Sequence, residues 1–362
     1  MTSVVLAGGG TAGHTSPLIA TAEALKVLEP GIHLVCIGTA RGLETRVVPA
    51  AGLALELITP VPMPRKPNLD LAKLPWRMLQ SVRESRRILR DADADALVGF
   101  GGYVSIPAYI AARTMGVPVV IHEANMVPGI ANRIGARFAA HVATTFAETS
   151  LPGGQLIGMP MSSSITTADM SVAQAREQFD LHPTLPVLLV SGGSQGARSI
   201  NNAVVSALDE FLAHGIQVLH VLGPKNFTDE HVLRTHPSGG RYRPVAFVER
   251  MADAYRAADM MLARGGAATV METAVSGLPV VFVPLPWGNG EQEKNASGLV
   301  NSGAGLMIHD DALDGPTLCS EILPRLVDPA RLKEMSKTAR SHYPRDAAEA
   351  LARATLSVIS KS

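Results

Sequence analysis

The chain has 362 residues, of which 46% are hydrophobic and 18% are charged. This length is enough for two ordinary domains of roughly 100 to 200 residues each. Lysine and arginine together number 32, as do aspartate and glutamate, so the formal net charge is zero. The balance excludes a global field that would recruit nucleic acid, and any electrostatic partner must meet a local patch of charge.

The two cysteines, Cys36 and Cys319, fall in different halves of the chain. Neither has histidines at metal-ligand spacing, so we expect reduced thiols in a cytosolic protein. The first apolar run begins at Val4, which leaves no room for a secretory leader, and we expect that the protein is not exported. An uncharged run at 96–112 is shorter than the roughly 20 residues that a bilayer needs, and glycines and a proline interrupt it.

A glycine-rich turn occurs twice, as GGTAG at 9–13 and as GGSQG at 192–196, each after a short apolar run. The runs at 4–9 and 187–193 predict buried strands, each ending in a turn that opens a helix. Glycines let a ligand approach the backbone, and the free N–H groups and positive dipole end of the helix suit a diphosphate. The repetition predicts two Rossmann-like units facing one another, with a ligand in the cleft.

Apolar runs alternate with helical patterns in both halves, which is typical of parallel strands buried on both faces. The polar, Ser/Thr-rich text of 160–169 predicts an interdomain hinge, and an apolar stripe at 346–359 predicts a closing helix. We expect an N-terminal domain at 1–161, a C-terminal domain at 162–342, and a last segment, 343–362, that packs back on the N-terminal domain. Further predicted strands are 33–38, 95–100 and 117–123 in the first half, and 216–223, 242–248, 258–264 and 278–286 in the second.

The first glycine loop also satisfies GxGxxG, at Gly8, Gly10 and Gly13, which is the pattern of nicotinamide dehydrogenases. Such a site needs an acidic residue at the end of the second strand to hold the ribose, but the text of 38–40 is Gly-Thr-Ala. The acidic run at 91–95 resembles a metal-holding motif, yet it precedes a strand, whereas ligands gather at the carboxyl ends of strands. Both interpretations are therefore disfavoured.

Seven strings follow one another between residues 4 and 296: GGGTAGHTSP, GFGGYVSIP, HEAN, VSGGSQGARSIN, FVERMADAY, RGGAATVMETAVSGLPVVFVPLP and EQEKNA. Together and in this order they resemble the motifs of the MurG family of N-acetylglucosaminyltransferases. The resemblance implies two Rossmann-like α/β domains in the GT-B fold, and an inverting transfer that uses no metal and no cofactor. It implies a transferase of peptidoglycan synthesis, and hence of cell wall biogenesis, cell shape, cell division and the cell cycle. The expected reaction moves N-acetylglucosamine from UDP-N-acetylglucosamine to the C4 hydroxyl of the muramyl sugar of undecaprenyl-linked lipid I, forming lipid II.

The same resemblance implies that the donor binds mainly to the second domain. Ser194 would donate to the diphosphate, Val248 would read the uracil through its backbone, and Glu272 would accept from the ribose hydroxyls. Asn125 and Gln292 carry amides that both donate and accept, which suits sugar hydroxyls. The complete expected donor set is Thr11, Ala12, Gly13, Asn125, Ser194, Val248, Arg264, Ala267, Ala268, Thr269, Val270, Met271, Glu272 and Gln292.

In this reaction the muramyl hydroxyl must lose a proton as it attacks C1 of N-acetylglucosamine. His14, beside the first glycine loop, is the first candidate for the base because imidazole titrates in the useful range, and Glu123 is the second. A histidine that only hydrogen-bonds the loop or the acceptor diphosphate stays an open alternative. The acceptor phosphate loop is expected at Gly101, Gly102, Tyr103 and Ser105.

Two positions depart from the family pattern. Ser162 stands where the family usually ends a GxPxR-like turn in arginine, so a bidentate cation contact is absent there. The family's pair of glutamines is reduced to Glu291 and Gln292, of which only the second is retained.

A polyprenyl acceptor implies an enzyme that reaches the membrane without spanning it. Residues 71–89 mix apolar and cationic side chains, which suits an anionic interface, although an ordinary amphipathic helix with a basic solvent face is the alternative. We expect a peripheral protein on the cytoplasmic side of the cell membrane, with divisome or elongation proteins as further partners and no nucleic acid. The apolar residues are Leu74, Trp76, Met78, Leu79 and Val82, and the cationic ones are Arg65, Lys66, Lys73, Arg77, Arg83, Arg86 and Arg87.

Two other functions stay open at this point. A UDP-sugar epimerase of the same fold would convert the donor without any lipid acceptor. A membrane-docked scaffold that has kept a nucleotide pocket would turn over nothing, and the missing arginine at Ser162 is the only feature that favours it.

Overall fold

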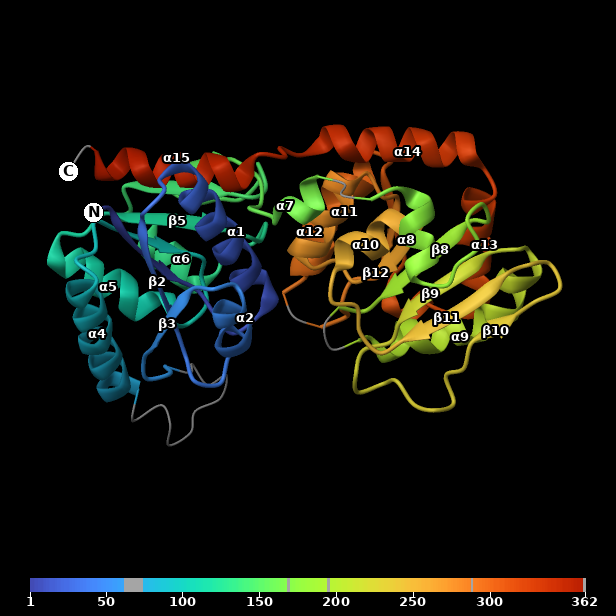
Figure 1. Cartoon of the computed structure of the whole chain (residues 1–362), viewed down its shortest axis with the longest axis horizontal. Coiled ribbons are helices and arrows are strands. Elements are labelled where there is room, and N and C mark those ends of the chain that lie inside the picture. The colour runs from blue at the N-terminus through green and yellow to red at the C-terminus, as the bar shows by residue number, and fades with distance from the viewer. Residues whose placement is uncertain (62–73, 168–169, 194–195, 288, 361–362) are drawn as a thin grey trace. The chain divides into compact units, whose positions relative to one another are not determined.

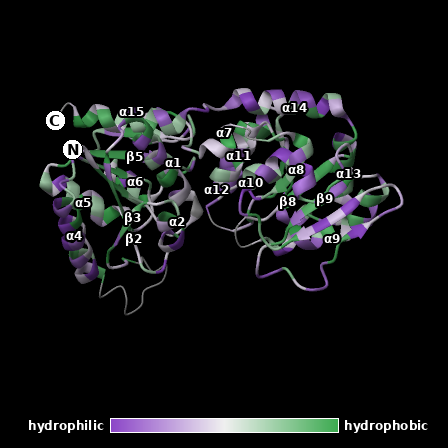
Figure 2. Ribbon diagram, viewed as in Figure 1, coloured by the Kyte–Doolittle hydropathy of each residue, from purple (hydrophilic) through white to green (hydrophobic). Residues whose placement is uncertain are grey.

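The computed structural model describes residues 1–61, 74–167, 170–193, 196–287 and 289–360 (Figure 1). The chain divides into two compact units, Met1–Ser162 with Pro344–Ser362, and Ser163–Tyr343. Each unit is built on a twisted sheet, and inner strands such as β5 and β8 are hydrophobic (Figure 2). The predicted class, two Rossmann-like α/β domains, is confirmed.

The sheet of the first unit has the strand order β3-β2-β1-β4-β5-β6-β7, and all neighbouring strands are parallel. Its strands are β1 (Ser3–Ala7), β2 (His33–Gly38), β3 (Ala54–Leu57), β4 (Ala96–Gly99), β5 (Val119–Glu123), β6 (His141–Thr144) and β7 (Gly154–Leu156). Its helices are α1 (Ala12–Leu28), α2 (Glu44–Ala50), α4 (Leu74–Asp91), α5 (Ser105–Met115), α6 (Ile130–Gly135) and α15 (Ala347–Ile359).

Both faces of this sheet are covered by helices. Successive residues of β1 point to opposite faces, so Val5 and Ala7 join a buried cluster with α4 and α5. Val4 and Leu6 join a second buried cluster with α1 and α15. This double burial is why the strand reads as an unbroken apolar run.

The end of the chain returns to the first unit through α15. Leu351, Ala352 and Val358 of α15 are buried in one cluster with Leu18 and Leu25 of α1. The apolar stripe of the closing helix therefore has a specific partner on the first sheet's outer layer.

The sheet of the second unit has the order β10-β11-β9-β8-β12-β13-β14, in which only the β10–β11 pair is antiparallel. Its strands are β8 (Val187–Ser191), β9 (Gln217–Val221), β10 (Arg234–Thr235), β11 (Arg241–Val245), β12 (Met260–Ala263), β13 (Val280–Phe282) and β14 (Gly305–Met307). Its helices are α7 (Ser163–Thr166), α8 (Val172–Gln178), α9 (Arg198–Ala213), α10 (Met251–Ala257), α11 (Ala267–Ser276), α12 (Glu291–Asn301), η1 (Asp310–Ala312), α13 (Gly315–Leu326) and α14 (Pro329–His342).

Each strand predicted from an apolar run is present, and most are shorter by one to several residues because the turns begin earlier. Five strands lack an apolar run and were not predicted, namely β3, β6, β7, β10 and β14. Four of them, β3, β7, β10 and β14, lie at a sheet edge, where less of the strand is buried, and β6 lies next to an edge. Within the described part of the chain, no helix is both long and apolar enough to cross a membrane.

Candidate active site

The strand order of each sheet reverses at one point, between β1 and β4 in the first unit and between β8 and β12 in the second. Loops that leave two such strands diverge at their carboxyl ends, and ligands of open α/β sheets bind there. In the first unit these loops contain 8–11 and 100–104, and in the second they contain the described residues 192–193, 196–197 and 264–266. The predicted glycine motifs therefore occupy both switch points.

His14 lies in the first turn of α1, directly after the first glycine loop. Its Nδ1 is 3.1 Å from the carbonyl oxygen of Gly9 and 3.3 Å from Oγ1 of Thr11. A carbonyl only accepts, so this contact assigns the proton to Nδ1 and leaves a lone pair on Nε2. Burial lowers the pKa of His14 from its ordinary value, so the ring is neutral at neutral pH. The structure thus presents a neutral imidazole with an unprotonated Nε2.

The loop after β4 passes next to this ring. Gly101 and Gly102 have φ angles of +89° and +79°, which favour glycine, and a Cβ on Gly101 would lie 3.3 Å from Nε2 of His14. Tyr103 is exposed, whereas the buried hydroxyl of Ser105 is 2.7 Å from the carbonyl oxygen of Gly101. Of the expected acceptor residues, Ser105 therefore holds the loop from inside and does not present its hydroxyl to a ligand.

Glu123, the second candidate for the base, is buried at the end of β5. Its carboxylate accepts hydrogen bonds from the N–H groups of Asn125 (2.9 Å) and Gly129 (3.0 Å) and from Nδ2 of Asn132 (2.9 Å). These donors stabilise the ionised carboxylate and tie it to the loop after β5. The geometry favours a role in holding this loop, which carries Asn125, over a role in proton transfer.

The expected donor residues of α11 fall on two faces of that helix. Ala267, Val270 and Met271 are buried in the interior of the second unit, so their side chains face away from solvent. Ala268, Thr269 and Glu272 are half-buried and share the other face, as the helical period requires. The N-terminus of α11 begins at Gly266, where its first N–H groups lack intrahelical partners.

Glu272 is held by a neighbouring helix. The hydroxyl of Tyr255 in α10 donates to its carboxylate at 2.7 Å. Burial raises the pKa of Glu272 to about 7, although the hydrogen bond from Tyr255 opposes the shift. The carboxyl group is therefore poised to ionise near neutral pH.

The guanidinium group of Arg264 forms hydrogen bonds and an ion pair within the second unit. It contacts Oδ1 of Asp310 at 2.6 Å, Oγ of Ser199 at 2.8 Å and the carbonyl oxygen of Val283 at 3.0 Å. The charge of this buried side chain is paired with Asp310, and its contacts tie the loop after β12 to the start of α9, to the end of β13 and to η1. Its support for a diphosphate would come through the loop that it positions.

Two further donor positions are arranged by backbone contacts. Oε1 of Gln292 accepts from the N–H of Leu285 at 3.0 Å, which orients the amide, and no described group accepts from its Nε2. Val248 is buried after β11, so only its backbone can meet a base edge. Ser194 lies outside the described residues, as do Arg65, Lys66 and Lys73, and the side chain of Ala12 is likewise not described.

One residue of this site was missed by sequence reasoning. Glu44, at the start of α2, is fully buried, and its carboxylate accepts from the N–H of Gly10 at 2.8 Å and of Thr39 at 2.9 Å. The text after β2 was compared with the dinucleotide pattern only as far as residue 40, and Glu44 follows four residues later as the first residue of α2. Its carboxylate supports the glycine loop from within.

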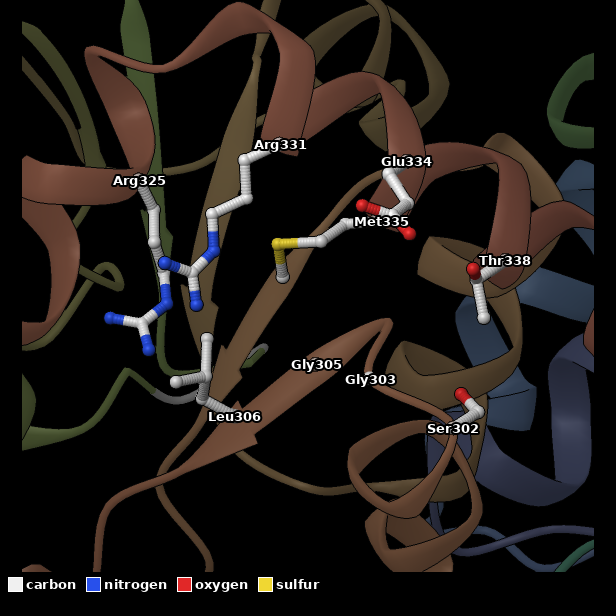
Figure 3. A pocket seen from close by; sticks show the side chains of 9 residues that line it. All are labelled: Ser302, Gly303, Gly305, Leu306, Arg325, Arg331, Glu334, Met335 and Thr338. Atoms are coloured by element: carbon white, nitrogen blue, oxygen red, sulfur yellow. The ribbon is translucent and has the colours of Figure 1, made fainter.

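A cavity of about 330 Å³ in the second unit is lined by none of the predicted site residues (Figure 3). Its lining consists of Ser302, Gly303, Gly305, Leu306, Arg325, Arg331, Glu334, Met335 and Thr338. No cluster of three or more His, Cys, Asp or Glu side chains suited to a metal ion occurs among the residues that the structure describes.

The family models assign the chain to the glycosyltransferases. Residues 4–144 match the N-terminal domain of glycosyltransferase family 28, and residues 187–351 match its C-terminal domain. The chain belongs to glycosyltransferase family 28, and its resemblance to MurG, noted from the motifs, is confirmed by individual relatives.

Two curated relatives each bear the description UDP-N-acetylglucosamine--N-acetylmuramyl-(pentapeptide) pyrophosphoryl-undecaprenol N-acetylglucosamine transferase. The protein of Cutibacterium acnes is 52% identical over 97% of this chain and 96% of its own length. The protein of Nocardioides sp. is 48% identical over 98% of this chain and 97% of its own. The crystal structure of MurG from Acinetobacter baumannii is similar over 99% of this chain and 100% of that chain, with a TM-score of 0.78 and 27% identity.

Proposed function

We propose that this protein transfers N-acetylglucosamine from UDP-N-acetylglucosamine to the C4 hydroxyl of the muramyl sugar of lipid I, forming lipid II. The full-length relatives described as this transferase support the reaction. The observation that carries the mechanism is the neutral ring of His14, whose Nε2 lies against the glycine loop at Gly101.

In the proposed step, Nε2 of His14 accepts the proton of the C4 hydroxyl as that oxygen attacks C1 of N-acetylglucosamine. The bond from C1 to the phosphate oxygen breaks, its electron pair leaves with UDP, and the configuration at C1 inverts. The imidazolium that forms keeps its Nδ1–H bonded to the carbonyl of Gly9 and later returns the proton from Nε2 to solvent.

Negative charge develops on UDP during this step. The N-terminus of α11 offers N–H groups and the positive end of a helix dipole, and this end is held by the Arg264–Asp310 pair. A fixed donor of this kind is worth roughly 3 to 4 kcal/mol when it is aimed at developing charge. Glu272, on the solvent-facing side of the same helix, would accept from the ribose hydroxyls.

Membrane contact is proposed for the outer face of α4. Trp76 and Leu79 are 68% and 43% exposed, and Arg83 and Arg87 follow on the same face. The opposite face is anchored by buried residues of the helix, Ser81, Ser85, Ile88 and Leu89. Exposed apolar side chains beside arginines support peripheral attachment to an anionic bilayer surface.

The test is transfer of labelled N-acetylglucosamine from UDP-N-acetylglucosamine to a short-chain lipid I analogue, with EDTA present and a control without acceptor. Product that depends on the acceptor supports the proposal and a reaction independent of free metal. Conversion of the donor without acceptor would favour an epimerase, and no turnover at all would favour a scaffold.

A further inference from the structure

A buried carboxylate lies directly under the first glycine loop. Glu44 has no exposed surface, and its oxygens accept from the N–H groups of Gly10 (2.8 Å) and Thr39 (2.9 Å) and from Oγ1 of Thr39 (3.0 Å). Glycines make room for it, since a Cβ on Gly9 would lie 2.5 Å from Oε1 and one on Gly38 would lie 2.5 Å from Cγ.

In the part of the chain that the structure describes, hydrogen bonds alone hold the charge of Glu44. Among the described residues, no lysine or arginine forms an ion pair with it. Burial opposes its ionisation, but the hydrogen bonds from Gly10 and Thr39 outweigh burial and keep the pKa of Glu44 below its ordinary value. Burying a charged carboxylate without a cation is unfavourable in free energy. We therefore infer that the charge of Glu44 has a function at the first glycine loop.

One peptide group connects this carboxylate to the imidazole of His14. The N–H of Gly10 donates to Glu44 Oε2, and the carbonyl of Gly9, at the other end of the same planar peptide, is 3.1 Å from Nδ1 of His14. Hydrogen bonds in such a chain polarise one another, so the carboxylate makes the Gly9 oxygen a stronger acceptor.

Other ionisable groups face the ring as well. Burial lowers the pKa of His14, whereas the Gly9 carbonyl and the charge of Glu44 raise it. His122 of β5 is buried and neutral, with a pKa of about 4, and Glu123 reaches this region through Asn132, whose Nδ2 would lie 3.3 Å from a Cβ on Gly101. Of these groups, Glu44 is joined to the Nδ1 side of the ring.

We propose that Glu44 is a positioning residue for the transfer reaction. Through the Gly9–Gly10 peptide it holds the proton of His14 on Nδ1 and stabilises the imidazolium that forms when Nε2 takes the acceptor's proton. The arrangement resembles the carboxylate–histidine pair of serine proteases, with a peptide group inserted between the two side chains. The catalytic use of His14 rests on the proposed function, but the tautomer and the protonation of its ring do not.

The first experiment therefore measures the ring and not the reaction. Long-range ¹⁵N–¹H NMR of histidine-labelled full-length protein, assigned with His14→Gln, gives the tautomer and the pKa of His14. In the wild type the proton should reside on Nδ1. In Glu44→Gln, whose amide NH₂ must face a backbone N–H, the pKa of His14 should fall and the Nε2–H tautomer should gain population. Glu44→Asp keeps the charge and should restore part of both.

A matched control is available in the same unit. Glu84 of α4 accepts from the N–H of Thr59 at 2.5 Å and from its Oγ1 at 2.9 Å, so it holds a threonine as Glu44 does, with no described contact to His14. Glu84→Gln should leave the His14 signals unchanged. The proposal is overturned by an Nε2–H tautomer in the wild type, by unchanged His14 signals in Glu44→Gln, or by equal shifts in Glu84→Gln. If Glu44→Gln does not fold, the tautomer of His14 in the wild type still tests the proposal.

Kinetics then separate positioning from simple support. With a soluble acceptor, Glu44→Gln should lower kcat roughly 10- to 100-fold. The acid limb of its pH profile should move to lower pH, while KM for the donor stays near the wild-type value. A lower kcat with an unmoved acid limb would reduce Glu44 to structural support. If the wild type itself has no turnover, the proposed function fails, while the NMR result on His14 still stands.

Discussion

The donor site should bind its ligand more tightly as the pH rises through neutrality. Burial raises the pKa of Glu272 to about 7, while its hydrogen bond from Tyr255 opposes that shift. A carboxylate accepts hydrogen bonds from two hydroxyl groups through its two oxygens, whereas one oxygen of a protonated carboxyl group carries a hydrogen and acts as a donor. The ribose hydroxyls therefore favour the ionised form. Binding of UDP-N-acetylglucosamine is thereby coupled to loss of a proton from Glu272.

The size of the effect follows from the pKa. With a value of about 7, about one tenth of the carboxyl groups are ionised at pH 6 and about nine tenths at pH 8. Because apparent affinity scales with the fraction of protein that has an ionised Glu272, the dissociation constant of the donor should fall about tenfold over this range.

The same raised pKa means that the folded state holds this proton more tightly than the unfolded state does. Glu272 therefore contributes stability below its ordinary pKa of 4.5, and that contribution is lost as the pH rises to about 7.

Calorimetric titration of UDP-N-acetylglucosamine at pH 6, 7 and 8 measures this directly, since the diphosphate of the donor does not titrate there. Glu272→Gln should remove the pH dependence. Tyr255→Phe removes a hydrogen bond that favours the ionised carboxylate, so its affinity curve should move to higher pH. An affinity that is flat with pH in the wild type, or equally steep in Glu272→Gln, would refute the assignment of Glu272 to the ribose.

Three further outcomes are expected. Trp76→Glu should reduce binding to anionic vesicles several-fold, while turnover of a soluble acceptor survives. As a control, Val27→Glu, at a residue of α1 that is 79% exposed, should leave vesicle binding unchanged. Equal losses of binding for the two variants in a sedimentation assay would show that α4 does not contact the membrane. Arg264→Ala should cost roughly 3 to 5 kcal/mol of unfolding free energy, because it removes a buried guanidinium group and leaves the half-buried carboxylate of Asp310 without its cation. An unchanged urea midpoint would contradict this. Leu351→Ala should lower the free energy of unfolding by roughly 2 to 5 kcal/mol, because it opens a cavity between α15 and α1. A thermal midpoint equal to that of the wild type would show that α15 does not stabilise the unit.

Local pattern accounts for much of this fold. Strands β1 and β8 are buried on both faces, so all their residues except Ser3 and Ser191 are apolar, and glycine follows where a turn must open a helix. Together with the motif order, these features predicted two Rossmann-like units and the residue stretches at both switch points. Strands β3 and β7 escaped because they are mostly exposed edge strands, which bury too little to need an apolar run.

The sequence by itself determined the two-unit architecture, the position of the glycine loops and the family, because these depend on backbone conformation, on burial and on the order of motifs along the chain. Only the tertiary structure decided how the polar side chains are used. Arg264 pairs with Asp310, 46 residues away, and Glu123 is tied to its own loop. Glu44 reaches His14 through a peptide of another loop. A polar side chain forms a hydrogen bond with a group that the fold brings within about 3 Å of it. The packing of strands and helices determines which group that is, and the local sequence does not specify this packing.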